Sequence, residues 1–292
     1  MNNTRIAVLA VAALSLASCA RKDAPEPPVA TPGVTLDHDR APLGSPVEIT
    51  YRFEVAKDAP PFAEDYTVFV GVVDPDEELM WTDDHVPAVP TKQWKPGQKV
   101  EYTRTVFVPI FPYIGEASIH MGLYSTATNK RLSLSGEDMG QRAYKVAKIQ
   151  LLPQTENVFT VFKEGWHSPE SPPNDTSVEW QWTKKEATLG FKNPKKDSVF
   201  YLDVDASMTF AEGQQIQVKI VDRVVSEFML APAQRSLHKI PLTTAQLGDA
   251  DLVDLRIVVD KTFVPALLPA AGSKDPRELG IRVFHAFIGP KQ

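Results

Sequence analysis

The sequence predicts an all-β protein made of two antiparallel β-sandwiches, and three observations support this fold class. The chain has 292 residues, which suits two domains at roughly 100 to 200 residues each. It contains 25 Pro but only 15 Gly, a balance that favours extended segments and turns over long helices. Between Pro46 and Val55 apolar and polar residues alternate strictly, which is typical of a half-buried strand.

The first half of the chain, residues 34–153, is predicted to form an Ig-like β-sandwich. Its short strand-like runs follow one another at the spacing that such sandwiches use. These runs cover residues 46–55, 66–73, 100–108, 116–124 and 144–152. Turn signals such as Asp74-Pro75-Asp76 and Lys95-Pro96-Gly97 separate them.

The second half, residues 154–292, is predicted to form another antiparallel sandwich. Its strand-like runs cover residues 158–162, 179–191, 199–205, 216–221, 224–230, 253–259 and 280–288. The run 280–288 is apolar on both faces, which indicates a strand in the middle of a sheet. Residues 234–251 offer at most one short helix.

Residues 1–18 have the pattern of a secretory signal peptide. Arg5 is followed by an eleven-residue apolar stretch from Ile6 to Leu16, and then by small residues. A bilayer-spanning helix needs about 20 apolar residues, so this stretch is too short to be a membrane anchor. We therefore expect export and removal of the segment.

The single cysteine, Cys19, follows the signal directly. The run Leu16-Ala17-Ser18-Cys19 resembles the lipobox of bacterial lipoproteins, which implies cleavage before Cys19 and acylation of that residue. The alternative is a chance cysteine beside an ordinary cleavage site. In lipoproteins an Asp after the cysteine favours the inner membrane; Ala20 here implies the outer membrane. Residues 19–33 are rich in Pro and are expected to form an extended tether.

Composition and motifs exclude several functions. The net charge is −6 and no run of basic residues is present, so we expect no nucleic-acid partner. One cysteine permits neither a disulfide framework nor a cysteine-based zinc site. The six histidines lack metal-ligand spacing, and neither a phosphate loop, a Rossmann fingerprint nor a GxSxG motif occurs. No metal, cofactor or catalytic residue is therefore predicted.

Two sets of motifs resemble accessory modules of bacterial polysaccharide-related proteins. Residues 68–79, 90–97, 122–125 and 131–132 look like a β-sandwich module often appended to membrane glycosyltransferases. Residues 164–167, 260–265 and 275–280 are similar to a jelly-roll-like accessory module of polysaccharide-related envelope proteins. The resemblance implies a jelly-roll-like second sandwich and a non-catalytic envelope protein associated with surface glycans.

Three tryptophans and one histidine are candidate ligand-binding residues, because indole rings can stack on sugar faces. Trp180 and Trp182 lie two positions apart on a strand and so share one face, which belongs either to the core or to a binding surface. Trp166 and His167 precede a Pro-containing loop and are expected to be exposed there.

Arg277 and Glu278 enter the final strand and are also candidate ligand-binding residues. A guanidinium presents five donors in a planar fork that could hold a sugar hydroxyl or an acidic sugar. It could equally clamp a neighbouring carboxylate such as Asp260 or Asp275 and fix the loop. The clamp is the favoured interpretation.

Asp83-Asp84-His85 contains residue types that bind metals or transfer protons. In an extended segment neighbouring side chains point to opposite faces, so at most Asp83 and His85 can converge. A solvated turn is the favoured interpretation.

Taken together, the sequence predicts a non-catalytic, lipid-anchored protein of the cell envelope that binds or accompanies a surface polysaccharide. One alternative is a structural lipoprotein that docks on another envelope protein complex by its sheet edges or an apolar patch. A more remote alternative, a hydrolase, depends only on scattered carboxylates. An exposed ring platform beside Arg277 would favour glycan binding, whereas a flat apolar patch would favour protein docking.

Overall fold

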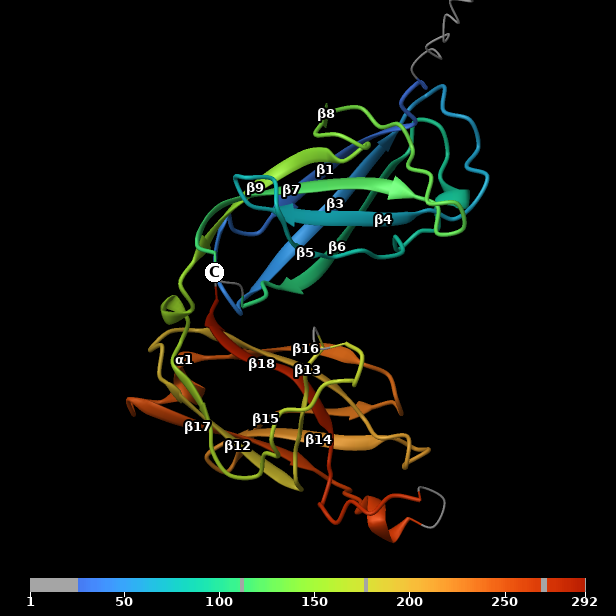
Figure 1. The fold of residues 1–292 in the computed structure, drawn as a ribbon. Helices are drawn as coiled ribbons and strands as arrows, with labels where there is room; N and C mark the ends of the chain where they lie inside the picture. Colours follow the sequence, from blue (N-terminus) through green and yellow to red (C-terminus); the bar gives the residue numbers. More distant parts are fainter. Residues whose placement is uncertain (1–25, 111–112, 176–177, 269–271, 292) are drawn as a thin grey trace, which may run out of the picture.

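The computed structural model describes residues 26–110, 113–175, 178–268 and 272–291, and strands dominate these residues (Figure 1). Its strands form four sheets that pack as two β-sandwiches, each around its own hydrophobic core. The predicted all-β fold class is therefore confirmed. Helical structure in these residues is limited to α1 (Thr244–Leu247) and three single 3-10 turns, η1 (Thr91–Gln93), η2 (Gln154–Glu156) and η3 (Pro265–Leu267).

The N-terminal sandwich contains strands β1 to β9. One sheet has the order β1 (Ala30–Leu36), β3 (Pro46–Val55), β6 (Lys99–Phe107). The facing sheet has the order β2 (Arg40–Pro42), β9 (Tyr144–Leu152), β7 (Gly115–Tyr124), β4 (Thr67–Val73), β5 (Leu79–Thr82), with β8 (Glu137–Asp138) beside β9. All of these pairs are antiparallel except β2 with β9.

The alternation in β3 decides which of its faces enters this core. Tyr51 and Phe53 are completely buried, while the intervening Arg52 is not. Burying one such large side chain contributes about 1.5 to 3 kcal/mol. The period of two in the sequence therefore orients the sheet.

The C-terminal sandwich contains strands β10 to β18. One sheet has the order β10 (Thr160–Phe162), β12 (Glu186–Lys192), β17 (Leu252–Val259), β14 (Gln214–Ile220), β15 (Arg223–Leu230). The second sheet has the order β11 (Gln181–Trp182), β18 (Arg282–Pro290), β13 (Ser198–Asp205), β16 (Ser236–Leu242). As expected from its apolar faces, β18 is an internal strand.

Several segments differ from the sequence predictions, among them the following three. The expected strand 179–191 is split between β11 and β12, because the chain crosses from one sheet to the other at Thr183. The buried hydroxyl of Thr183 accepts a hydrogen bond from Ile281 N at 3.1 Å. Strand β16 was not expected; it contains Pro241, which a sheet tolerates at its edge. Strand β1 begins at Ala30, inside the segment expected to be tether, because residues 30–36 pair with β3.

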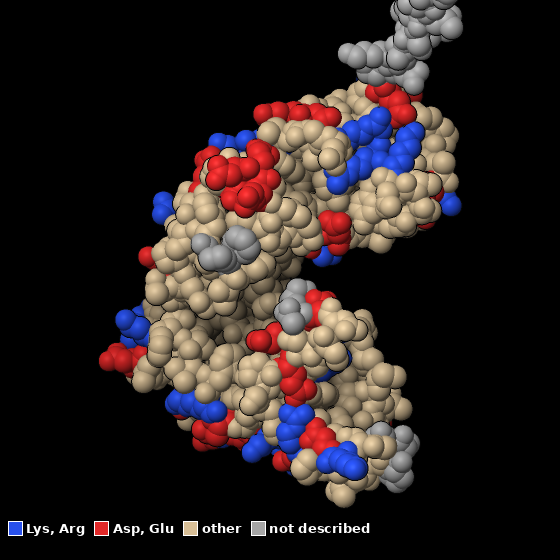
Figure 2. All heavy atoms as spheres, viewed as in Figure 1, with Lys and Arg blue, Asp and Glu red and all other residues tan. Residues whose placement is uncertain are grey.

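The two sandwiches meet along the outer face of the β11-β18-β13-β16 sheet (Figure 1). Phe107 at the end of β6 stacks on His285, with the ring centroids 3.9 Å apart, and also contacts Tyr201. Lys239 forms an ion pair with Glu48 at 2.5 Å. Beyond these contacts Figure 2 shows an open notch between the two lobes. Whether each half folds alone stays a prediction.

Candidate functional site

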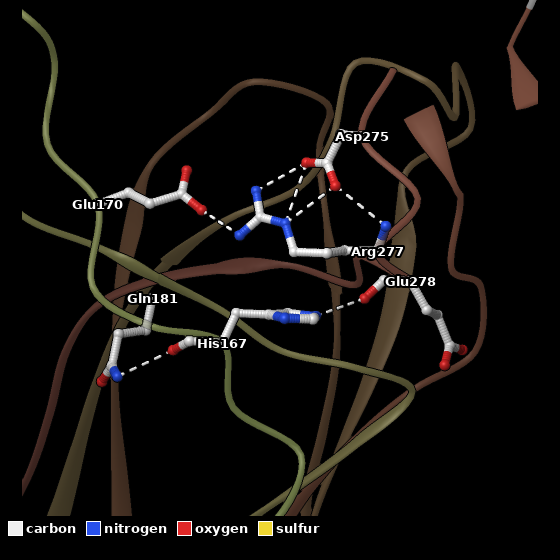
Figure 3. Close-up of polar contacts among 6 residues, drawn as sticks. All are labelled: His167, Glu170, Gln181, Asp275, Arg277 and Glu278. Atoms are coloured by element: carbon white, nitrogen blue, oxygen red, sulfur yellow. Dashed lines mark hydrogen bonds and ion pairs between the residues drawn. The ribbon is translucent and has the colours of Figure 1, made fainter. Parts of the chain in front are cut away.

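His167, Arg277 and Glu278 come together, but each is held by partners within the protein (Figure 3). Arg277 donates from Nε to Asp275 Oδ1 at 3.0 Å and from Nη2 to Asp275 Oδ2 at 2.7 Å. Its Nη1 donates to Glu170 Oε1 at 2.5 Å. The Arg277 guanidinium lowers the pKa of Asp275 to about 2. The geometry therefore shows a clamp, with Asp275 and not Asp260 as the local partner.

The other two members of this cluster also fasten loops. His167 Nε2 lies 2.7 Å from the carbonyl oxygen of Glu278, which can only accept, so Nε2 carries a proton. The Glu278 carboxylate points away and accepts from Thr262 Oγ1 at 2.8 Å (Figure 3). The cluster joins the segment before β11 to the segment before β18, which is a structural role.

Trp166 faces away from this cluster, because neighbouring residues of an extended segment point to opposite sides. Its indole N–H donates to Thr188 O at 2.8 Å, and the ring packs on the C-terminal core and on Phe162. Gly165 permits this approach: a Cβ there would lie 1.9 Å from Glu186 O, and its φ is +86°. The expectation that Trp166 is exposed was therefore wrong, since close packing on β12 partly buries it. Among the described residues, no aromatic ring contacts the Arg277 guanidinium.

Trp180 and Trp182 share one face, as predicted, and that face is on the outside of the sandwich. In the β-sheet register Trp182 pairs with Arg282, whose side chain also points outward. Both indoles are half-buried, and the Arg282 guanidinium carbon lies 5.1 Å from the Trp180 ring centroid and 5.9 Å from that of Trp182. The interpretation as core residues does not hold for this pair.

Phe284 lies two residues after Arg282 on β18, extends this surface and is the extra residue of a β-bulge. The register between β13 and β18 shifts after Asp203, which leaves Phe284 as the extra residue. Bulges of this kind redirect a side chain. The Phe284 ring lies 6.2 Å from Trp180 and carries Arg235 at 3.9 Å above its centroid. We call this surface, made of Trp180, Trp182, Phe284, Arg235 and Arg282, the aromatic face.

Two carboxylates orient the arginines of the aromatic face. Arg282 Nε donates to Asp205 at 2.9 Å, and Arg235 donates from Nε and Nη2 to Asp203 at 3.0 and 2.6 Å. The two aspartates are only 4% and 8% exposed. Burial opposes ionisation of Asp203, but hydrogen bonds from His285 and Arg235 outweigh it and lower its pKa. Both guanidiniums are therefore fixed in orientation.

The aromatic face is an arrangement of half-buried rings flanked by planar donors. It belongs to the same sheet face that meets the N-terminal sandwich at His285, so it lies beside the joint between the lobes. Figure 1 shows β18 beginning on the open side and ending at this joint. Rings of this kind offer apolar stacking area, and fixed guanidiniums offer directed donors.

Sequence reasoning missed Arg235, Arg282, Phe284 and the two aspartates. A signal for the two aspartates was present, because Asp203 and Asp205 alternate with apolar residues in a strand and so share one face. The spacing of Arg282 and Phe284 matches that of Trp180 and Trp182 and so indicates a shared face, but the register shift next to Phe284 has no such signal.

Asp83 and His85 converge, as the spacing allows. His85 Nδ1 lies 2.6 Å from the Asp83 carbonyl and its Nε2 lies 2.7 Å from the Tyr102 hydroxyl. Arg104 donates to the Asp83 carboxylate at 2.8 and 3.0 Å, while Asp84 turns away to a backbone N–H of β4. Burial is the main cause that lowers the pKa of His85. The expected solvated turn was wrong, since Asp83 and His85 belong to a largely buried network.

The described residues contain no group of three or more His, Cys, Asp or Glu side chains that could hold a metal ion. Within the same ranges, none of the helices is long and apolar enough to cross a membrane. The predicted signal peptide and Cys19 lie outside the described residues.

Comparison with known proteins gives only distant likenesses. No family model matches the chain, and no curated protein sequence matches it. The solved structure of SGBP-B from a complex xyloglucan utilization locus in Bacteroides uniformis is 8% identical, with a TM-score of 0.35, over 90% of this chain and 74% of that one. Spo0M, a sporulation control protein from Bacillus subtilis, is 12% identical, with a TM-score of 0.29, over 74% and 91%.

A Bacillus subtilis glycoside hydrolase family 43 arabinoxylan arabinofuranohydrolase is 9% identical, with a TM-score of 0.27, over 89% of this chain and 54% of that one. Two of these three bacterial proteins are glycan-related by their own descriptions. At such identities and TM-scores the likenesses carry no argument about this chain.

Proposed function

We propose that the protein is a non-catalytic, lipid-anchored accessory protein of the bacterial cell envelope, and that it binds a glycan on the aromatic face. The observation that supports glycan binding most directly is the set of outward-facing rings Trp180, Trp182 and Phe284 between two fixed guanidiniums. Sugar rings stack on such side chains through their C–H faces.

Polar groups would set the orientation of the bound sugar. Each arginine of the aromatic face binds its aspartate through Nε and Nη2, so Nη1 remains for a ligand as far as the described contacts show. A ligand site needs only a few such groups beside apolar surface. Neutral and acidic sugars both offer suitable acceptors.

The carboxylates at this site have no catalytic role in the proposed function. Asp203 and Asp205 are each paired with an arginine and nearly buried. A general acid needs a raised pKa, whereas the pKa of Asp203 is lowered. Binding without catalysis therefore suits these residues better than hydrolysis.

Retention on immobilised envelope polysaccharides tests the glycan site. Trp182→Ala and Phe284→Ala are each expected to weaken retention about ten-fold, because one stacked ring is lost. Phe159→Ala is the matched control, since Phe159 is 65% exposed and lies outside the aromatic face. Equal weakening by the control, or no retention of the unmodified protein on any polysaccharide, would contradict the proposal and favour protein docking.

Metabolic labelling with palmitate tests the anchor. Acyl chains contribute roughly 0.8 kcal/mol per buried methylene, so several chains on Cys19 hold the protein stably. Metabolic labelling with palmitate is expected to mark the unmodified protein and not Cys19→Ala. Equal labelling of the two would overturn the lipoprotein proposal without bearing on the glycan site.

A further inference from the structure

A basic patch lies at the end of the N-terminal sandwich where the described chain begins. It is made of Lys130, Arg131 and Arg142, and Figure 2 shows Lys and Arg side chains gathered at this end of the molecule. Glu26 forms ion pairs with Lys130 at 3.0 Å and with Arg142 at 2.9 Å. The first described residue of the chain is therefore attached to the patch.

The patch has a defined shape. Its three cations, with Asn129 and Gln141, line a shallow depression of about 350 Å³. Asn129, Gln141 and Arg142 all have left-handed backbone conformations, with φ between 54° and 58°. Conformations of this kind persist where the surrounding structure holds them, and they are frequent at ligand-binding sites.

The guanidiniums of the patch are fixed and still have donors. Arg131 lies over the Phe69 ring at 4.1 Å and donates from Nη1 to Gln141 O at 3.0 Å. Arg142 uses Nη1 for its hydrogen bonds with other described residues, including one to Arg131 O. Among the described contacts the remaining nitrogens are unused, and guanidiniums bind phosphate oxygens well.

The covalent chain limits how far the patch can be from the anchor. Glu26 comes seven positions after Cys19, and a fully extended chain spans at most about 3.6 Å per residue, or roughly 25 Å in all. An acylated Cys19 would thus hold the patch close to the lipid surface. The whole chain carries a charge of −6, so an anionic surface repels most of the protein and attracts this end.

We propose that the basic patch binds the phosphates of anionic lipid headgroups, so that this end of the N-terminal sandwich faces the membrane. The proposal rests on the lipid anchor proposed above. With this end on the membrane, the aromatic face on the other sandwich is turned towards the periplasm or the cell surface, where it can bind a glycan.

The expected strength follows from the charges. Three cations and Glu26 leave a net charge of +2. Each basic residue near an anionic membrane strengthens binding about five-fold, which predicts roughly 30-fold for the patch. This contribution is measurable when the anchor itself is weak.

The test uses residues 19–292 with one alkyl chain attached to the unique Cys19 thiol through a maleimide. A single chain of this kind gives only marginal binding, with an association constant of about 10⁴ M⁻¹. Sedimentation is measured with vesicles of phosphatidylcholine alone and with vesicles containing about one third phosphatidylglycerol. We expect roughly 30-fold stronger binding to the anionic vesicles, and loss of this difference in high salt.

Lys130→Glu removes two units of charge at a side chain that is 61% exposed, so it should abolish the roughly 30-fold preference without unfolding the protein. Lys184→Glu, on the C-terminal sandwich, is the charge-matched control and should retain the preference. Equal binding to both vesicles, or equal loss in both variants, would overturn the proposal. Because the alkyl chain is attached chemically, such a failure is distinguishable from a failure of acylation at Cys19.

Discussion

Arg277 and Arg282 lie close together in the sequence, and both bind an aspartate through Nε and Nη2. Arg277 binds Asp275, two residues before it, and Glu170 on a neighbouring loop. Arg282 binds Asp205 across the sheet and has aromatic rings around it. The first arginine closes a loop, whereas the second takes part in an open surface.

The difference shows that residue type does not define a binding site. The Arg277 guanidinium already uses Nε, Nη1 and Nη2 for two carboxylates, so it has little left to offer a ligand. A guanidinium that binds one carboxylate and lies beside half-buried rings presents both a donor and a stacking surface. The neighbours from distant strands decide between the two roles.

The largest expected effect on stability concerns Trp166, which precedes His167 of the Arg277 cluster, and Trp182, which belongs to the aromatic face with Arg282. Trp166→Ala should destabilise the C-terminal sandwich by about 3 kcal/mol, because it leaves a cavity against the core and removes a hydrogen bond. Trp182→Ala should cost about 1 kcal/mol, since that ring faces outward. Denaturant unfolding of both variants measures the difference; the reverse order would show that Trp182 is the structural ring.

Replacing the aspartate partner of each arginine should give a smaller difference in stability between the two variants. Asp205→Asn leaves the Arg282 charge partly buried without a counter-charge, and we expect a loss of about 2 kcal/mol. Asp275→Asn leaves Arg277 with Glu170 in a more exposed setting, and we expect a clearly smaller loss of stability. Equal losses of stability in thermal unfolding would mean that the two ion pairs contribute equally to the stability of the fold.

The smallest effect on stability concerns the pKa of Asp275. Arg277 lowers it to about 2, so the clamp contributes fully above the unfolded value near pH 4 and is lost as the pH falls towards 2. A carboxyl titration followed by NMR should show this pKa, and Arg277→Gln should raise it. Part of the lowering should remain, because the backbone N–H of residue 277 still donates to Asp275 Oδ1 at 3.0 Å. An unchanged value in the variant would mean that another group holds the carboxylate.

Local pattern was sufficient for most strands. The alternation of residues 46–55 corresponds to β3, and the runs at 144–152 and 224–230 correspond closely to β9 and β15. Each of these strands has one apolar face, and burial of that face sets its orientation. The edge strands β2, β5 and β16 were missed because short edge strands carry few buried residues and tolerate Pro.

The sequence by itself determined the all-β fold class, the pairing of Trp180 with Trp182 on one face, and the approach of Asp83 to His85. Each of these follows from the two-residue period of an extended chain, which is a local property. Only the tertiary structure decided that Trp166 packs inward, that Arg277 binds two carboxylates, and that Arg235 lies over Phe284 in the aromatic face. Those outcomes depend on contacts between residues far apart in the chain, and no local period encodes them.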